Sequence, residues 1–206
     1  MVKPTHTDPH TGTPAPASGS AHTAGHSASV QPAPARGWFA RLGRILRHRW
    51  MDEADTRRAV PPELLKRLED YVTASEARHS GEVRICVEAG MPTSYLRRDA
   101  TPRQRAIAVF GKLRVWDTEY NNGVLIYLLL AEHAIELVAD RGLNAKVSAN
   151  EWSAITQHLS ASLKAGEYEA GLTHALEEVS ALLVQHYPLA EGQTRNNHLP
   201  NAPDLR

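Results

Sequence analysis

The stretch that decides the fold runs Glu119-Tyr-Asn-Asn-Gly-Val-Leu-Ile-Tyr-Leu-Leu-Leu-Ala-Glu-His-Ala-Ile-Glu-Leu-Val-Ala-Asp-Arg-Gly-Leu143. Its first half contains an unbroken apolar run, residues 124–130, which is typical of a central strand covered on both faces. In its second half, residues 134–140 point their side chains alternately to two sides, as a strand does. Because only Glu132-His133 separates the two runs, they predict an antiparallel hairpin.

The open end of this hairpin brings polar side chains and glycines together. Asn121-Asn122-Gly123 precedes the first strand and Asp140-Arg141-Gly142 follows the second, so strand pairing places them side by side. Two further carboxylates stand just before the asparagines. Oxygen ligands of this kind suit a hard cation such as calcium or magnesium, and the candidate ligands are Asp117, Glu119, Asn122 and Asp140. The alternative is a polar loop whose asparagines make turns and whose acids face water.

Patterns on both sides of the hairpin complete the fold. Upstream, Glu82–Ala89 alternates as a strand, between a helix opened by Pro61-Pro62-Glu63 and a helix capped by Thr101. Downstream, two more helices follow, the first ending at Ala165-Gly166 and the second running to about His186. A strand–helix–strand crossover that leads into a hairpin predicts an α/β fold, a small mixed β-sheet with helices on both faces.

Composition divides the chain into four predicted parts. Residues 1–35 consist mainly of Pro, Thr, Ser, Ala, Gly and His and cannot offset their ordering entropy by burial, so we expect a disordered tail. Residues 36–50 are predicted to form a basic amphipathic helix, and residues 51–187 the α/β domain. Residues 188–206 are polar and punctuated by proline, which predicts a flexible C-terminal tail.

Charge and motif content exclude several classes of function. The chain has 206 residues with 23 basic and 23 acidic side chains, so no overall field favours nucleic acid and no nucleic-acid partner is expected. The single cysteine, Cys86, excludes an internal disulfide. The sequence has no Gly-rich phosphate loop, no zinc-protease motif, no serine-nucleophile motif and no paired-cysteine site, and we expect no organic cofactor.

The basic segment 36–50 is the clearest sign of a partner. Its apolar side chains share one arc of the predicted helix, and its five arginines come without any acid. Tryptophans at both ends of such a helix suit the surface of an anionic membrane, or a membrane-protein partner, and the expected contact residues are Trp38, Arg41, Arg44, Arg47 and Trp50. The alternatives are a helix docked on the domain with its arginines in solvent, and a helix that meets an acidic partner protein.

The sequence also predicts where the protein is found. No run approaches the ~20 apolar residues that a membrane span needs, and the N-terminus lacks the apolar core of a signal peptide. We therefore expect a cytoplasmic protein that associates peripherally with the inner membrane.

Two further patterns leave alternatives to the cation site. Ligands of open sheets usually bind at the carboxyl ends of parallel strands, which here is the opposite end, near Glu88, Glu132 and His133. His174 and Glu178 stand four residues apart on a predicted helix, but two ligands do not make a metal site. We expect them to lie on a solvated helix face, and His158 to be structural or solvated.

Several segments resemble a known family, the TPM domain, which is named for a thylakoid-lumen phosphatase, a photosystem II repair protein and an animal receptor modulator. The first strand, the helix ending in tryptophan, the Asn-Asn-Gly motif, the turn after the hairpin and the opening of the last helix occur in the family's order. These segments are Ser80–Ile85, Phe110–Trp116, Asn121–Ile126, Asp140–Leu143 and Lys164–Leu172. The basic helix resembles that of a bacterial branch described as membrane proteins.

The resemblance implies a compact α/β sandwich, with divalent-cation binding and a weak acid-phosphatase activity in some members. Asp140-Arg141 replaces the family's usual glycine and aromatic residue, which adds a carboxylate for a cation and makes Arg141 a candidate phosphate ligand. We expect a non-enzymatic accessory protein that binds a divalent cation, a membrane-protein partner, or both. The alternative is a weak cation-dependent phosphatase-like hydrolase, for which the sequence offers no activated nucleophile.

Overall fold

The computed structural model describes residues 37–189 and 199–206, so the predicted tail 1–35 and Arg36 lie outside the described residues. Its helices are α1 (Trp38–Trp50), α2 (Glu53–Ala59), α3 (Pro62–Glu76), α4 (Thr93–Arg97), α5 (Pro102–Lys112), α6 (Arg141–Asn144), α7 (Ala149–Lys164) and α8 (Tyr168–His186). Its strands are β1 (Val83–Glu88), β2 (Val124–Leu129), β3 (Ala134–Ala139) and β4 (Asp204–Leu205).

The strands form one mixed sheet in the order β3-β2-β1-β4. β1 pairs with β2 in parallel, with Val83 opposite Val124, and β2 pairs with β3 antiparallel. A single 3-10 turn, Leu130–Glu132, joins the two strands of the hairpin, and His133 closes it in the left-handed conformation with φ 49°. The predicted hairpin and the predicted crossover are therefore both confirmed.

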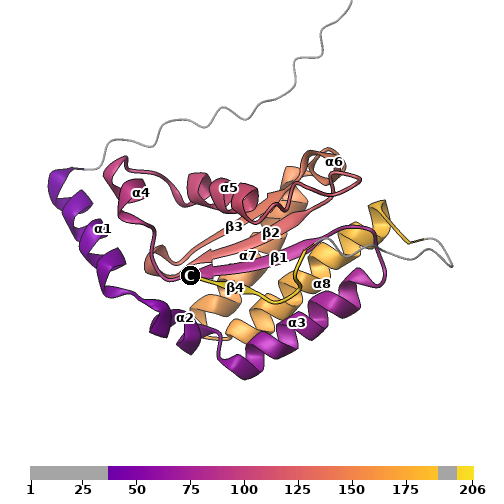
Figure 1. Ribbon diagram of the computed structural model, residues 1–206, viewed down its shortest axis with the longest axis horizontal. Coiled ribbons are helices and arrows are strands. Elements are labelled where there is room, and N and C mark those ends of the chain that lie inside the picture. The colour runs from indigo at the N-terminus through magenta and orange to yellow at the C-terminus, as the bar shows by residue number, and fades with distance from the viewer. Residues whose placement is uncertain (1–36, 190–198) are drawn as a thin grey trace, which may run out of the picture. The chain divides into compact units, whose positions relative to one another are not determined.

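Helices cover the sheet on both faces, as predicted. Figure 1 shows α5 on one side of the strands and α3 and α8 on the other. α7 packs beside α8 and against β3. The protein has an α/β fold, a small mixed sheet flanked by helices.

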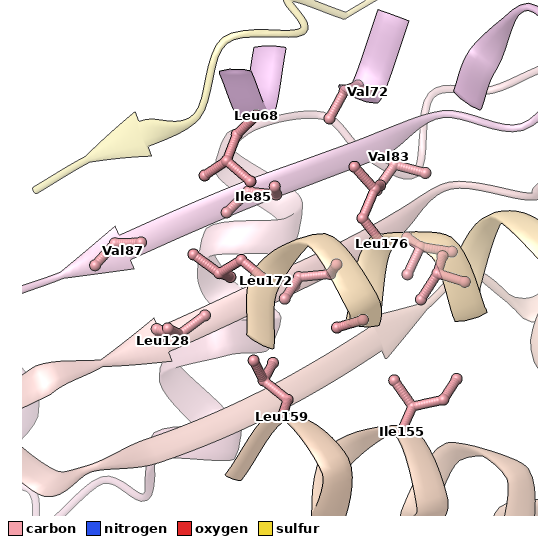
Figure 2. Close-up of a cluster of buried hydrophobic side chains, with 14 of the residues drawn as sticks. Leu68, Val72, Val83, Ile85, Val87, Leu128, Ile155, Leu159, Leu172 and Leu176 are labelled. Carbon is pink, nitrogen blue, oxygen red and sulfur yellow. The ribbon is translucent and has the colours of Figure 1, made fainter. Parts of the chain in front are cut away.

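Alternation along the strands divides the core between the two faces. Val83, Ile85 and Val87 of β1 point toward α3, α7 and α8, where they meet Leu68 and Leu172 among other buried apolar side chains (Figure 2). The intervening positions Cys86, Leu125 and Tyr127 face α5. All six residues of β1 and all six of β2 are buried, as expected for central strands that are covered on both faces.

Local signals fix the helix ends. Thr101 accepts a hydrogen bond from the Gln104 backbone and Gln104 bonds back to it, a capping box that starts α5. Pro62 opens α3 in its first turn, where a missing N–H costs nothing. α7 ends just before Gly166, whose φ of +80° suits glycine.

The C-terminal residues differ from the predicted flexible tail. β4 pairs in parallel with β1, with Asp204 opposite Cys86, so residues 204–205 extend the sheet. The Arg206 backbone continues this pairing through hydrogen bonds with Val87 and Ala89. Sequence pattern missed this strand because two residues carry no periodic signal, and the same holds for the short helices α4 and α6.

Candidate functional site

The two polar turns meet at the open end of the hairpin, as the sequence predicts. The Asp140 N–H donates to the Gly123 carbonyl at 2.8 Å, and the Gly142 N–H donates to the Asn121 carbonyl at 2.9 Å. Asn121 adopts a positive φ of 51°, which asparagine tolerates better than most residues. The backbone therefore holds both turns in fixed positions.

The four candidate cation ligands have different surroundings. Asp117 is exposed and pairs with Arg114 at 2.6 Å, while Glu119 is exposed beside Tyr120 and raises the pKa of that phenol. Asp140 caps α6 by accepting a hydrogen bond from the Arg141 N–H at 2.7 Å. Asn122 is fully buried. In the described residues, the carboxylates of Asp117, Glu119 and Asp140 do not converge into a group of three metal-ligating side chains.

Two oxygen atoms at this end are buried and have no hydrogen-bond partner. They are Oδ2 of Asp140 and Oδ1 of Asn122. The rest of each side chain is engaged, since Asp140 caps α6 and the Asn122 amide donates to Ser80 Oγ at 3.2 Å. The Arg141 guanidinium is exposed and donates to Asn121 Oδ1 at 3.3 and 3.4 Å. A buried carbonyl or carboxylate oxygen without a partner is costly, and a bound cation would satisfy it.

The glycines of the two turns are required by packing. A Cβ on Gly123 would lie 1.9 Å from the Val115 carbonyl oxygen, and a Cβ on Gly142 would lie 2.5 Å from the Tyr120 carbonyl oxygen. Both glycines therefore let two backbone segments approach closely. Packing therefore accounts for the glycines of the Asn-Asn-Gly and Asp-Arg-Gly turns without any ligand.

At the opposite end of the sheet, the carboxylates are engaged in buried ion pairs. Glu88 accepts hydrogen bonds from Arg105 Nε at 2.9 Å, from Arg105 Nη2 at 2.5 Å and from the Tyr127 hydroxyl at 2.5 Å. Burial disfavours the charge on Arg105, but its contacts with Glu88 outweigh that cost and raise the pKa of Arg105. Burial also raises the pKa of Tyr127, and it raises that of Cys86 to about 12. The hydroxyl of Tyr127 and the thiol of Cys86 therefore stay protonated at neutral pH, and the Glu88 carboxylate is engaged by Arg105 and Tyr127.

Glu132 is the second engaged carboxylate, and it anchors α1. Arg44 Nε donates to Glu132 Oε1 at 2.6 Å, and His48 Nε2 lies 2.8 Å from the same oxygen. His48 Nδ1 accepts a hydrogen bond from the Met91 N–H at 2.9 Å, so Nε2 carries the proton that binds Glu132. Burial opposes the charge on Glu132, but the hydrogen bonds from His48 and Arg44 lower its pKa.

Arg44 makes two further contacts with the segment after α4. Its Nη1 donates to Asp99 at 3.0 Å and its Nη2 to the Ala100 carbonyl at 2.6 Å. A Cβ on Gly90 would lie 2.6 Å from the His48 carbonyl oxygen, so a glycine is needed where α1 passes the end of β1. We call Arg44, His48 and Glu132 the polar anchor of α1, because their contacts hold this helix against the domain.

The apolar side of α1 faces solvent. Trp38 is 68% exposed and Trp50 is 85% exposed, and Phe39, Leu42 and Leu46 are exposed as well. We call these five residues the apolar face of α1. Arg41, Arg47 and Arg49 are also exposed, and no acid occurs between residues 37 and 50.

This orientation corrects the sequence-based expectations for the helix. Arg44 is predicted as a membrane or partner contact, but it is buried, because its guanidinium ends in the ion pair with Glu132. The docked alternative is confirmed in part, because α1 is docked on the domain and Arg41, Arg47 and Arg49 are exposed. Most of the apolar arc is exposed as well, and its member Ile45 is the one that packs against the core. The sequence names Glu132 as a candidate ligand residue but not its pairing with Arg44 and His48, because no local pattern pairs residues more than 50 positions apart. The contact of Arg44 with Asp99 was missed for the same reason.

The sequence pattern of the TPM domain matches residues 54–182, more than half of the chain. The chain belongs to the TPM domain family. The resemblance drawn from the motifs is therefore confirmed.

A solved structure supports the same fold for this TPM domain. The NMR structure of the BA42 protein from the psychrophilic bacterium Bizionia argentinensis is similar with a TM-score of 0.62 and 25% sequence identity. The similarity covers 71% of this chain and 95% of the BA42 chain. No curated protein matches the chain.

The family match leaves α1 outside the shared domain. The match begins at residue 54, after α1 has ended at Trp50. Within the described residues, no helix has both the length and the apolar character required to cross a bilayer. The apolar face of α1 therefore lies outside the residues that match the TPM domain.

Proposed function

We propose that this TPM-domain protein is a non-enzymatic accessory protein that binds the surface of an anionic membrane through α1. The observation that carries the proposal is the orientation of the helix. Its polar side chains Arg44 and His48 hold it to the domain, so its apolar face is left for another surface. Large exposed apolar patches mark interaction sites rather than ordinary surface.

Charge favours a lipid surface as the occupant. Arg41 and Arg47 border the apolar face and Arg49 lies within it, all exposed and without an acidic neighbour on the helix. Tryptophans at both ends suit the headgroup region, where an amphipathic ring has one apolar and one wet side. A membrane-protein partner would use the same helix, and the experiment below distinguishes the two.

Vesicle sedimentation tests this proposal on the full chain. We expect it to sediment with phosphatidylcholine vesicles that contain phosphatidylglycerol, and more weakly with phosphatidylcholine alone. Leu42→Glu together with Leu46→Glu should weaken binding at least about tenfold, because two leucines no longer enter the lipid. Arg47→Gln with Arg49→Gln should reduce only the preference for anionic lipid, by about 1 kcal/mol for each arginine.

Ile107→Glu is the matched control, since Ile107 is 47% exposed on α5, away from the apolar face of α1. Its vesicle binding should equal that of the unaltered chain. Equal losses in the control and the α1 variant would contradict the assignment to α1. Failure of the unaltered chain to bind anionic vesicles would favour a protein partner instead.

A divalent-cation site at the open end of the hairpin is the second function we propose. It is favoured by the two buried oxygen atoms without partners, Asp140 Oδ2 and Asn122 Oδ1. The phosphatase-like alternative would use this site, with Arg141 as the phosphate ligand. It lacks an activated nucleophile, because Ser80 accepts a hydrogen bond from the Asn122 amide, a contact that does not activate a hydroxyl.

Calorimetric titration of the full chain with calcium and magnesium tests the cation site. Saturable binding is expected, and Asp140→Asn should abolish most of it while keeping the cap on α6, because asparagine caps helices equally well. Asp70→Asn is the control, since Asp70 pairs with Lys66 on the exposed surface of α3. If Asp140→Asn leaves binding intact, the cation binds elsewhere. If the unaltered chain gives no heat with either cation, the two polar turns at this end have only a structural role.

A further inference from the structure

Two packed helices bring two histidines and a glutamate together, away from the hairpin ends and from α1. His158 lies on α7, and His174 and Glu178 lie one turn apart on α8. His158 Nδ1 is 2.9 Å from Glu178 Oε1, and His174 Nε2 is 3.6 Å from Glu178 Oε2. One potential ligand atom from each residue lies within 4.8 Å of the others, the only such group of three in the described residues.

A hydrogen-bonded His–Glu pair explains only part of this arrangement. It accounts for His158 and one oxygen of Glu178, but His174 lies 3.6 Å from the other oxygen of the same carboxylate. Glu178 Oε2 is buried and has no hydrogen-bond partner. A buried acceptor left in this state costs about 1–3 kcal/mol, and a cation held between the two imidazoles would remove that cost.

We propose that His158, His174 and Glu178 form a binding site for a divalent transition metal of the zinc class. Two imidazole nitrogens and one carboxylate oxygen are a donor set found in zinc proteins, whereas calcium and magnesium prefer oxygen alone.

The spacing allows the three donors to close around the ion. Donor atoms around a tetrahedral zinc ion stand about 3.4 Å apart, given bonds of about 2.1 Å. The observed separations from Glu178, 2.9 Å to His158 and 3.6 Å to His174, lie on either side of this value. The side chains of His158 and His174 are 54% and 57% exposed, so both rings have room to rotate. The same exposure leaves the fourth coordination position open to water.

Metal binding here would cross-link α7 and α8. The unfolded chain does not hold the three ligands together, so bound metal stabilises the folded state. Zinc should therefore raise the thermal midpoint of unfolding. This site and the proposed function of α1 are independent.

The experiment uses the full chain with His6, His10, His22 and His26 replaced by alanine, because histidine-rich tails bind metals weakly on their own. Titration with zinc against a chromophoric chelator should give one tight site. Cobalt(II) should give the intense visible absorption of tetrahedral coordination. His174→Ala and Glu178→Gln, added to this background, should each weaken zinc binding at least about 100-fold.

His186→Ala is the matched control, since His186 lies on the same helix outside the group. It should leave zinc affinity and the cobalt spectrum unchanged. His174→Ala replaces an exposed helix residue with the best helix former, so the fold should persist. Absence of a tight site in the tail-substituted chain, or unchanged zinc affinity in the His174 variant, would overturn the proposal.

Discussion

Glu88→Gln is expected to destabilise the domain by about 3–5 kcal/mol. Glu88 is 2% exposed and neutralises the Arg105 guanidinium, which is equally buried beneath α5. The substitution keeps the size of the side chain but leaves the cation without a counter-charge. Its amide group would also point a donor toward Arg105 and Tyr127, which themselves donate to this position.

Urea unfolding followed by circular dichroism measures this loss. Tyr127→Phe removes only one hydrogen bond to the same carboxylate and should cost about 1–3 kcal/mol. The triple variant Glu88→Leu, Arg105→Met and Tyr127→Phe removes both charges and the hydroxyl that donates to Glu88. It should recover most of the stability lost by Glu88→Gln, because the apolar replacements leave no buried charge or hydroxyl without a partner. A loss below about 1 kcal/mol for Glu88→Gln would show that the pair is not a buried charge pair in solution.

Gly123→Ala should also destabilise the domain strongly, by about 3 kcal/mol or more. The new methyl group would lie 1.9 Å from the Val115 carbonyl oxygen. No side chain can rotate to relieve that contact, so the loop after α5 has to move away from the start of β2. The cost is steric, since Gly123 does not have a positive φ.

Gly111→Ala is the matched control, because Gly111 lies in α5 with nothing within 4 Å of the added methyl group. It should stabilise the domain by about 1 kcal/mol, the difference in helix propensity between alanine and glycine. Denaturant midpoints of the two variants should therefore move in opposite directions. A Gly123→Ala variant as stable as the unaltered chain would mean that the two segments do not pack this closely.

Sequence predicts well where the signal is local. The apolar run 124–130, the alternation of Glu82–Ala89 and the Thr101 cap each depend on neighbouring residues, and the structure confirms all three. Hairpin pairing then forces the two polar turns together, because strand register determines which ends meet. The position of the candidate cation site follows from that register, although its occupancy does not.

Sequence fails where the decisive contact is distant. The helical periodicity of the apolar residues in α1 identifies an apolar arc, but it does not show whether this arc or the polar arc packs against the domain. That choice depends on Glu132, which pairs with His48 from 84 positions away. The group of His158, His174 and Glu178 likewise needs the packing of α7 on α8, so the i, i+4 spacing on α8 indicates only two of its three members.

Because of the polar anchor, α1 does not have to fold when it binds a surface. A free amphipathic segment of 13 residues is at best marginally helical in water, and ordering its backbone on arrival costs about 1–2 kcal/mol for each residue. Arg44 and His48 hold α1 in its helical form on the domain beforehand. On the proposed function, α1 is therefore already folded when it binds a surface. The entropy cost of ordering the helix belongs to folding of the protein and does not reduce the affinity for that surface.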